Sequence, residues 1–413
     1  MLARWLGLVA LVAMLLGVVG CGGVSVSDVA EATNDSLTVY SSLPLQGPTA
    51  SISQQIIDGE KLALADADDR AGAFKINYDS LDDASPTSGE WNPGITATDA
   101  KVAAQDTSTI AYLGDFDSGA TAVSLPVMNE VGILQISPAS PYVGLTSSFD
   151  AGQDEPERFY PSGKRTFMRL APGDTQQAAA QVQLMQSLGV HRLYVLDDQT
   201  AFLMPLADIV ADYAERAGIK VLEHDSLSTA VGAVFTGEVE KIIDSGAQAV
   251  FLAGGEGKGA AALWRDLHKA APQLQLLGSS SLASEAFTSQ IGAAAVVTYL
   301  TTPVLPTALY PPLAQQVLRH YRSVFGAEGG PYALYGYEAM TVVLDAVRDS
   351  GARGNDRQTV IDRVFATKNR SSVIGRYSVQ ADGETTLSQY GVDRVSAGRA
   401  VFLRALTVAA PGP

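Results

Sequence analysis

Four short loops in this sequence carry hydroxyl or carboxylate side chains, two of them together with glycine, and each directly follows an apolar run with the composition of a β-strand. They span residues 114–121, 137–140, 197–202 and 254–259. Where parallel strands end, helix N-termini present free N–H groups and the positive end of the helix dipole. The loops therefore predict a cleft for a small polar or anionic solute at the carboxyl ends of two sheets.

The first loop has the composition of an anion site. Ser118 offers a hydroxyl donor, and Gly119, Ala120 and Thr121 follow it at the expected start of a helix. Backbone N–H groups are free in a first helical turn, and charge-assisted hydrogen bonds to them are strong. We expect these four residues to hold the negative end of a ligand.

Catalytic chemistry has no comparable pattern. The histidines, at 191, 224, 268 and 320, lack the spacing of metal ligands, and no Gly-x-Ser-x-Gly elbow occurs. Residues 255–260 fit a relaxed dinucleotide fingerprint without an evident ribose-binding acid, and Leu252 and Gly259 break the P-loop pattern. We therefore expect no enzyme, no cofactor and no metal.

The elements that would position the loops alternate between strands and helices from residue 37, which is typical of βα units around parallel sheets. Up to residue 140 the pattern predicts strands at 37–42, 74–79, 110–113 and 133–136, with helices at 50–69, 98–106 and 121–131. Residues 142–165, rich in glycine and proline, interrupt it and predict a long surface excursion.

The alternation then resumes and predicts a second α/β unit. Its expected helices are 175–188, 203–217, 236–245 and 259–271, and its expected strands are 192–196, 219–222, 249–253 and 275–277. A third block is too small and too helical to stand alone, with strands at 296–300, 375–379 and 400–405 and helices at 312–325, 335–350 and 357–367. We expect it to complete the first two units, so that the chain crosses between lobes three times.

The amino-terminal residues indicate where the protein works. Arg4 precedes an apolar run that ends in Val18-Val19-Gly20-Cys21, and this layout resembles the bacterial lipobox. We expect a signal peptide over residues 1–20, lipidation of Cys21 and a flexible tether over 21–36. The alternatives are a signal peptide cut elsewhere and a short membrane span, although the run is shorter than the roughly 20 apolar residues that a span needs.

Composition restricts the partners. The 413 residues suffice for two domains of ordinary size. Acidic residues outnumber basic ones, 44 to 28, and the formal net charge is −16. This balance disfavours nucleic acid and a basic membrane-binding patch, so the lipid anchor is the expected route to the membrane.

Several short motifs follow one another in a fixed order. They are Gly47-Pro48 before Asp58-Gly59, the 114–121 loop before Gly132-Ile133 and Ser137-Pro138-Ala139, and Gly330-Pro331-Tyr332-Ala333 before Tyr335-Gly336-Tyr337-Glu338-Ala339. Their order and spacing resemble the substrate-binding lipoproteins of branched-chain amino acid ABC transporters, which have the type I periplasmic-binding fold. The resemblance covers nearly the whole mature chain and implies a two-lobe clamp that closes on a solute and docks on a permease.

The resemblance, applied position by position, implies that Ser118 binds the ligand carboxylate. It assigns Ala139 and Ser140 to a loop that contributes backbone groups, and Phe202 to an aromatic contact from the second lobe. Ser280 falls in the second-lobe site as well, where the family has a glutamate that binds the ligand ammonium.

Three positions depart from the family pattern: Pro141 replaces a threonine, Ser280 replaces the glutamate, and Ile52 replaces an aromatic residue. A zwitterion held only at its carboxylate end would leave its cation without a partner, at a cost of several kcal/mol. Either another carboxylate substitutes, with Glu256 and the Asp197/Asp198 pair as candidates, or the ligand is not an α-amino acid.

We therefore expect an α/β protein with two doubly wound parallel-sheet lobes joined by three hinge crossovers. Residues 37–170 and 302–373 are assigned to the first lobe, and residues 171–301 and 374–408 to the second. The expected protein is a lipid-anchored, extracytoplasmic monomer that delivers a small carboxylate-bearing or polar solute to an ABC permease. A sensing lipoprotein that keeps the clamp but signals to a partner is the alternative, and a hydrolase on the same scaffold would need a catalytic pair in the cleft.

Overall fold

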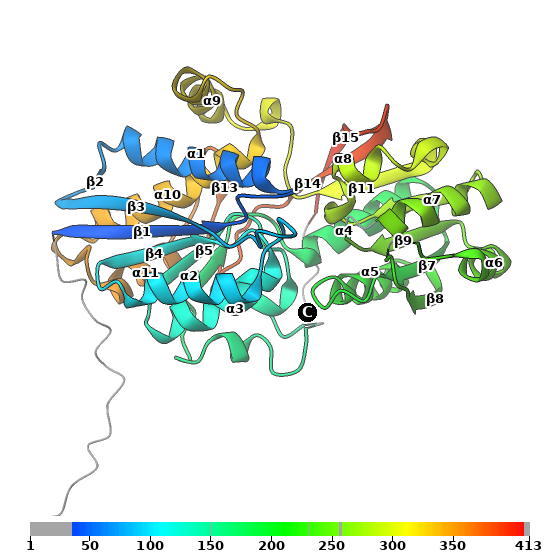
Figure 1. Cartoon of the computed structure of the whole chain (residues 1–413), viewed down its shortest axis with the longest axis horizontal. Coiled ribbons are helices and arrows are strands. Elements are labelled where there is room, and N and C mark those ends of the chain that lie inside the picture. Colours follow the sequence, from blue (N-terminus) through cyan, green and yellow to red (C-terminus); the bar gives the residue numbers. More distant parts are fainter. Residues whose placement is uncertain (1–34, 150, 231, 256–257, 409–413) are drawn as a thin grey trace, which may run out of the picture.

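A computed structural model of the chain describes residues 35–149, 151–230, 232–255 and 258–408. Figure 1 shows two lobes side by side, each built on a sheet with helices on both faces. The predicted α/β fold with two mainly parallel sheets is therefore confirmed. The expected signal peptide, residues 1–20, and Cys21 lie outside the described residues.

The first sheet has the order β2-β3-β1-β4-β5-β6, and only β2 runs antiparallel to its neighbour. Its strands are β1 (Ser36–Leu43), β2 (Arg70–Ala71), β3 (Phe74–Asp82), β4 (Thr109–Gly114), β5 (Leu134–Ser137) and β6 (Phe167–Arg169). Alternate residues of β1 enter two cores: Val39 packs with α1 (Ala50–Asp66) and α10 (Pro331–Asp349), and Tyr40 packs with α2 (Pro93–Gln105) and α3 (Ser118–Glu130). This period of two is that of a strand buried on both faces.

The second sheet has the order β15-β14-β11-β10-β9-β7-β8. Its strands are β7 (Arg192–Asp197), β8 (Lys220–Ser226), β9 (Ala249–Ala253), β10 (Gln275–Gly278), β11 (Thr298–Thr302), β14 (Gln389–Ser396) and β15 (Arg399–Thr407). One face packs on α4 (Asp174–Ser187) and α5 (Met204–Arg216), and the other on α6 (Thr236–Ser245), α7 (Lys258–Ala270) and α8 (Glu285–Thr288). Strands β14 and β15 are antiparallel additions at one edge.

The chain passes between the two sheets three times. It leaves the first sheet after β6, and after β11 it returns through α9 (Pro312–Phe325), α10 and α11 (Arg357–Phe365), which pack with the first lobe. After the β12–β13 hairpin (Arg370–Ser372 and Gly375–Tyr377) it enters the second sheet again at β14. The exact division of residues between the lobes stays a prediction.

Several expected boundaries were wrong for local reasons. Helix α1 stops at Asp66 because Asp68 and Asp69 have φ angles of 54° and 53°, in the left-handed region. Helices α2 and α10 begin several residues early, at Pro93 and Pro331, because proline is favoured at the first helical position. The strands β2, β6, β12 and β14 were not predicted, since the first three are very short and β14 mixes polar residues into its run.

Residues 142–165 are not simply a surface excursion, as the glycine and proline content had suggested. Tyr142, Val143, Leu145, Phe159 and Tyr160 are all buried in a core shared with the second sheet. The segment therefore ties the first lobe to α4 and α5.

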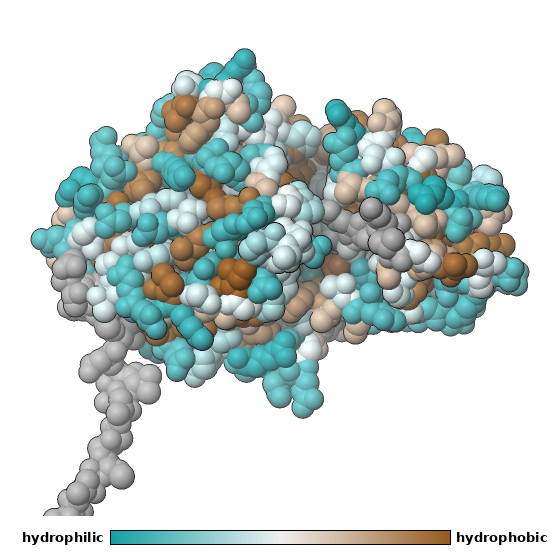
Figure 2. Space-filling view, viewed as in Figure 1, coloured by the Kyte–Doolittle hydropathy of each residue, from teal (hydrophilic) through white to brown (hydrophobic). Residues whose placement is uncertain are grey.

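The outer surface is mainly hydrophilic in the space-filling view, with apolar side chains in separate patches (Figure 2). None of the helices in the described part of the chain has the length and apolarity of a membrane span.

Helices α1 and α10 approach each other through two glycines. A Cβ at Gly59 would lie 2.1 Å from the Ala333 carbonyl oxygen, and a Cβ at Gly336 would lie 2.0 Å from the Ile56 carbonyl oxygen. Both obstacles are backbone atoms, so neither site has room for a side chain.

We predict that Gly336→Ala destabilises the protein by about 1–3 kcal/mol, because overpacking outweighs the better helix propensity of alanine. Urea unfolding checks this. Gly237→Ala on α6 is the matched control: apart from its own stretch of backbone, no atom of the described residues lies within 4 Å of a Cβ placed there, so equal or slightly higher stability is expected. Equal stability of both variants would contradict the close helix contact.

Candidate functional site

The topology places one crevice on each lobe. In the first sheet β1 lies between β3 and β4, and in the second β7 lies between β8 and β9, so the strand order reverses at both points. In open α/β sheets, ligands bind outside the carboxyl ends of the strands at such switch points. The predicted loops after β4 and β7 begin at these two places.

The N-terminus of α3 lies at the first crevice and touches the second lobe. Ser118 is the first residue of α3, and its Oγ accepts a hydrogen bond from the Tyr142 N–H at 3.2 Å. A Cβ at Gly119 would lie 2.3 Å from a Trp91 ring carbon and 2.9 Å from a Phe202 ring carbon, so only glycine admits both rings. The Phe202 ring also packs edge-on against Tyr142, with centroids 5.3 Å apart. The structure therefore brings the predicted anion site and the predicted aromatic residue together.

Other predicted residues of the first lobe are buried: Ala120, Thr121, Ala139 and Ser140. The hydroxyls of Thr121 and Ser140 share a hydrogen bond of 2.6 Å, and Ser140 Oγ also donates to the Asp115 carbonyl at 3.0 Å. The Ala139 N–H donates to Ser137 Oγ at 3.1 Å. These groups hold the loops beside Ser118 in place.

In the second lobe, Ser280 follows β10 and lies next to a helix that the sequence did not single out. Its hydroxyl donates to Oε1 of Gln177 on α4 at 3.0 Å, and the Tyr390 hydroxyl donates to the same oxygen at 3.0 Å. Glu256, the other predicted residue here, lies outside the described residues.

The carboxylates considered as substitutes for the family glutamate already have partners. Asp197 accepts hydrogen bonds from the Gln199 N–H and the Ser226 hydroxyl, at 2.8 and 2.7 Å. Asp198 accepts from the N–H groups of Thr200 and Gly255, at 3.1 and 2.7 Å. Both side chains therefore hold the second-lobe loops.

The residue that organises the loop beside Ser118 was not predicted from the sequence. Arg169, at the end of β6, is 1% exposed. Its guanidinium donates to the carbonyls of Ser140 and Tyr142, to the Thr146 hydroxyl and to the Glu384 carboxylate. Glu384 belongs to the third crossing, so this ion pair joins the loop beside Ser118 to the hinge.

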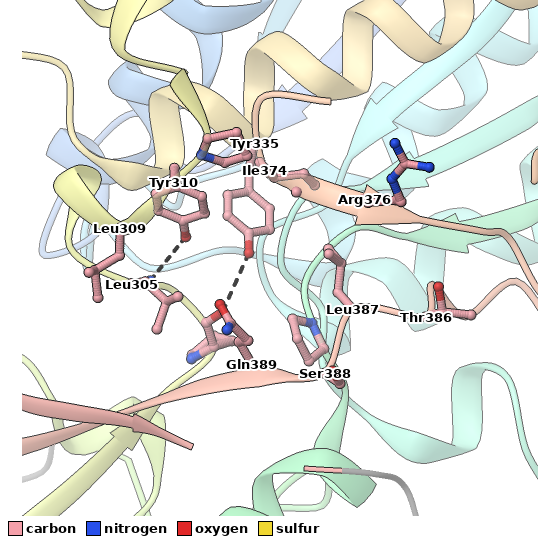
Figure 3. Close-up of a pocket in the computed structure, with 14 residues that line it drawn as sticks. Leu305, Leu309, Tyr310, Tyr335, Ile374, Arg376, Thr386, Leu387, Ser388 and Gln389 are labelled. Atoms are coloured by element: carbon pink, nitrogen blue, oxygen red, sulfur yellow. Dashed lines mark hydrogen bonds between the residues drawn. The ribbon is translucent and has the colours of Figure 1, made fainter. Parts of the chain in front are cut away.

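A hinge cavity of about 400 Å³ lies between the three crossing segments (Figure 3). Tyr335 and Tyr310 form part of its wall, and the Tyr310 hydroxyl accepts a hydrogen bond from the Leu305 N–H at 3.0 Å. An aromatic series leads from this cavity towards the α3 loop: Tyr335 contacts Tyr332, which contacts Phe116.

Two buried carboxyl groups lie near the carboxyl ends of β3 and β4. Asp83 and Asp115 are both fully buried. Burial, reinforced by the charge of Asp115, raises the pKa of Asp83 to about 8. Burial also raises the pKa of Asp115 to about 7, although hydrogen bonds from Ser124 and Tyr112 oppose the shift.

These shifts give a pH dependence of stability with a defined sign. Because the folded pKa lies above the unfolded value, the folded state binds more protons than the unfolded state between about pH 4 and pH 8. The free energy of unfolding should therefore fall as the pH rises through this window. Buried Glu60, whose pKa is raised to about 8 by desolvation, acts in the same direction.

We predict that Asp83→Asn weakens this dependence. The variant should match the parent below about pH 4, where the folded and unfolded states both bind the proton, and exceed it by a few kcal/mol at pH 8.5, since one pKa unit corresponds to about 1.4 kcal/mol. Urea unfolding at several pH values measures this, with exposed Asp244→Asn as the control. Parallel pH profiles for the parent and Asp83→Asn would contradict the assignment.

Two lobes of doubly wound sheet, linked by three crossings and touching through loops at their switch points, define the class of type I periplasmic binding folds. A family model described as periplasmic binding protein matches residues 41–399, and the chain belongs to this family.

The relatives agree with this assignment. The Leu/Ile/Val-binding protein homolog 3 of Brucella melitensis is 23% identical over 381 residues, 91% of this chain and 95% of the relative. The isoleucine complex of the branched-chain amino acid binding protein LivJ from Streptococcus pneumoniae is similar with a TM-score of 0.68 and 17% identity, covering 90% of this chain and 99% of LivJ. A solute-binding protein from Rhodopseudomonas palustris, in complex with 3,4-dihydroxybenzoic acid, has a TM-score of 0.69 and 16% identity over 92% of this chain and 99% of its own.

Proposed function

We propose that this protein is an extracytoplasmic solute-binding lipoprotein that closes its two lobes on a small carboxylate-bearing or polar solute and delivers it to an ABC permease. The observation that carries the proposal is the contact between Phe202 of the second lobe and Gly119 in the first turn of α3. A helix N-terminus suited to an anion thus faces an aromatic ring of the opposite lobe. The proposal treats the protein as a binder, in keeping with its family.

The negative end of the solute would bind at the start of α3. The N–H groups of Ser118, Gly119 and Ala120 are the first of the helix and have no intrahelical acceptor. The Ser118 hydroxyl is half-buried, so a hydrogen bond from it to a carboxylate would be charge-assisted and poorly screened. In this proposal Thr121, Ala139 and Ser140 keep the surrounding loops in shape, and Phe202 and Ser280 line the opposite wall.

The ligands named for similar structures support a carboxylate. Isoleucine, named for LivJ, and 3,4-dihydroxybenzoic acid, named for the R. palustris protein, share a carboxylate and differ in almost everything else. A ligand that contacts both lobes stabilises the closed form, because only that form makes both sets of contacts.

We predict that Ser118→Ala weakens binding of a carboxylate ligand by about 1–3 kcal/mol, the usual effect of losing a buried donor to a charged group. The ligand is first selected by thermal-shift screening of amino acids, short carboxylic acids, amides and ureas, since a ligand that binds only the folded state raises Tm. Titration calorimetry then compares Ser118→Ala with Ser323→Ala, a serine exposed on α9. Unchanged affinity in Ser118→Ala would remove this serine from the site.

We also predict that Cys21 anchors the protein to the membrane through attached lipid. Full-length protein expressed in a bacterial host should incorporate radioactive palmitate and partition into detergent, and Cys21→Ser should lose both properties. Cys21 is the only cysteine in the chain, so no other thiol contributes to the signal. Palmitate label that persists in Cys21→Ser would exclude lipidation at this residue.

A further inference from the structure

The hinge cavity has no part in the proposed function. Its wall takes residues from each of the three crossings: Pro172 from the first, Pro303 and Leu305 from the second, and residues 374–376 and 386–389 from the third. Its volume of about 400 Å³ falls within the range of roughly 300–1,000 Å³ that is typical of small-molecule sites. The cavity can therefore hold a small organic molecule, which would contact every segment that links the lobes.

The inner wall of the cavity is mainly apolar. Leu305, Tyr310, Tyr335 and Ile374 all line it, and none of them is more than 7% exposed. The two phenol groups already have partners, because the Tyr310 oxygen accepts from the Leu305 N–H at 3.0 Å and the Tyr335 hydroxyl donates to the Pro303 carbonyl at 3.4 Å (Figure 3). A ligand would thus gain chiefly by burying an apolar body against this wall.

The edge of the cavity carries a cation. Arg376 is exposed, and it is the one charged residue among the described residues that line the cavity. Figure 3 shows its side chain beyond Ile374 and Leu387. Arg348 and Arg370 of the same lobe pair with carboxylates, whereas the Arg376 guanidinium has no ion-pair partner among the described residues. Its flexible methylene stem allows the charged head to reach an anion at the edge of the cavity.

We propose that the hinge cavity is a second binding site, for a small organic anion whose apolar body fills the cavity and whose acid group pairs with Arg376. Guanidinium and carboxylate form charge-assisted, often bidentate hydrogen bonds. A cationic or zwitterionic ligand fits less well, since none of the described residues that line the cavity is acidic. The cavity shares no lining residue with the solute site proposed at Ser118, so this inference goes beyond the proposed function and does not depend on it.

The test uses octanoate as the probe and 1-octanol as its neutral counterpart, both titrated by calorimetry. The parent should bind octanoate more tightly than 1-octanol. We expect Arg376→Gln to weaken octanoate binding about threefold to fivefold, the effect of an ion pair near the surface, and to leave 1-octanol binding unchanged. Leu387→Trp, which places an indole in the cavity, should abolish binding of both. Arg319→Gln, an exposed arginine on α9, is the matched control and should bind like the parent.

Hydrogen–deuterium exchange then locates the probe on the parent protein. Octanoate should slow amide exchange in residues 303–311 and 374–389 and leave residues 114–121 unchanged. Slower exchange in 114–121 instead, or loss of octanoate binding in Ser118→Ala, would place the probe between the lobes and overturn the inference.

The remaining outcomes also decide the proposal. No binding of octanoate at millimolar concentration, or unchanged binding in Leu387→Trp, would exclude a site in the cavity. Equal affinity for octanoate and 1-octanol, or unchanged octanoate affinity in Arg376→Gln, would exclude an anionic ligand. Arg376→Gln alters an exposed side chain, so its result stands even if Leu387→Trp is unstable. A failure of amino acids and other solutes to bind at Ser118 would refute the proposed function and leave these results unaffected.

Discussion

The candidate site depends on the buried guanidinium of Arg169. It joins Glu384 of the third crossing to the carbonyls of Ser140 and Tyr142, and so fixes the loop that caps Ser118. Removing one partner from such a buried pair costs about 3–5 kcal/mol, because the remaining charge is left without compensation. The loop beside α3 is therefore held more firmly than surface contacts could hold it, and its geometry is set before any ligand arrives.

All five N–H donors of Arg169 are used in hydrogen bonds, so the two carboxyl groups near it differ in what they receive from it. Glu384 neutralises the guanidinium, whereas Asp174 lies near the same charge and receives no hydrogen bond from it. Burial raises the pKa of Asp174 to about 8, and the attraction of Arg169 only partly offsets this. Near neutral pH the Asp174 carboxyl is therefore mostly protonated, whereas Glu384 neutralises the guanidinium.

The sequence predicted helices and strands well where neighbouring residues alone determine where an element begins and ends. Helices α6 and α9 occupy the predicted ranges, and each ends at a glycine with positive φ, Gly246 and Gly326. Strand β14 was missed because its pairing with β11 and β15 is a tertiary property that its mixed composition does not reveal. In the site, Ser118 and Phe202 could be placed from composition and family resemblance. Arg169 could not, since its carbonyl, hydroxyl and carboxylate partners come from segments far apart in the sequence that only the fold brings together.

Two buried acidic residues of the first lobe lie close to the proposed anion site, and their raised pKa values reduce the conflict between them and a bound anion. Asp115 lies three residues before Ser118, and a fixed negative charge there would repel a bound carboxylate. The raised pKa values of Asp83 and Asp115 mean that near neutral pH these groups are largely or partly protonated. A carboxylate arriving at α3 would favour their protonated forms further, because it disfavours any additional negative charge nearby. Protonated Asp83 and Asp115 would then oppose the action of the N–H groups and dipole of α3 on a ligand less than ionised ones would.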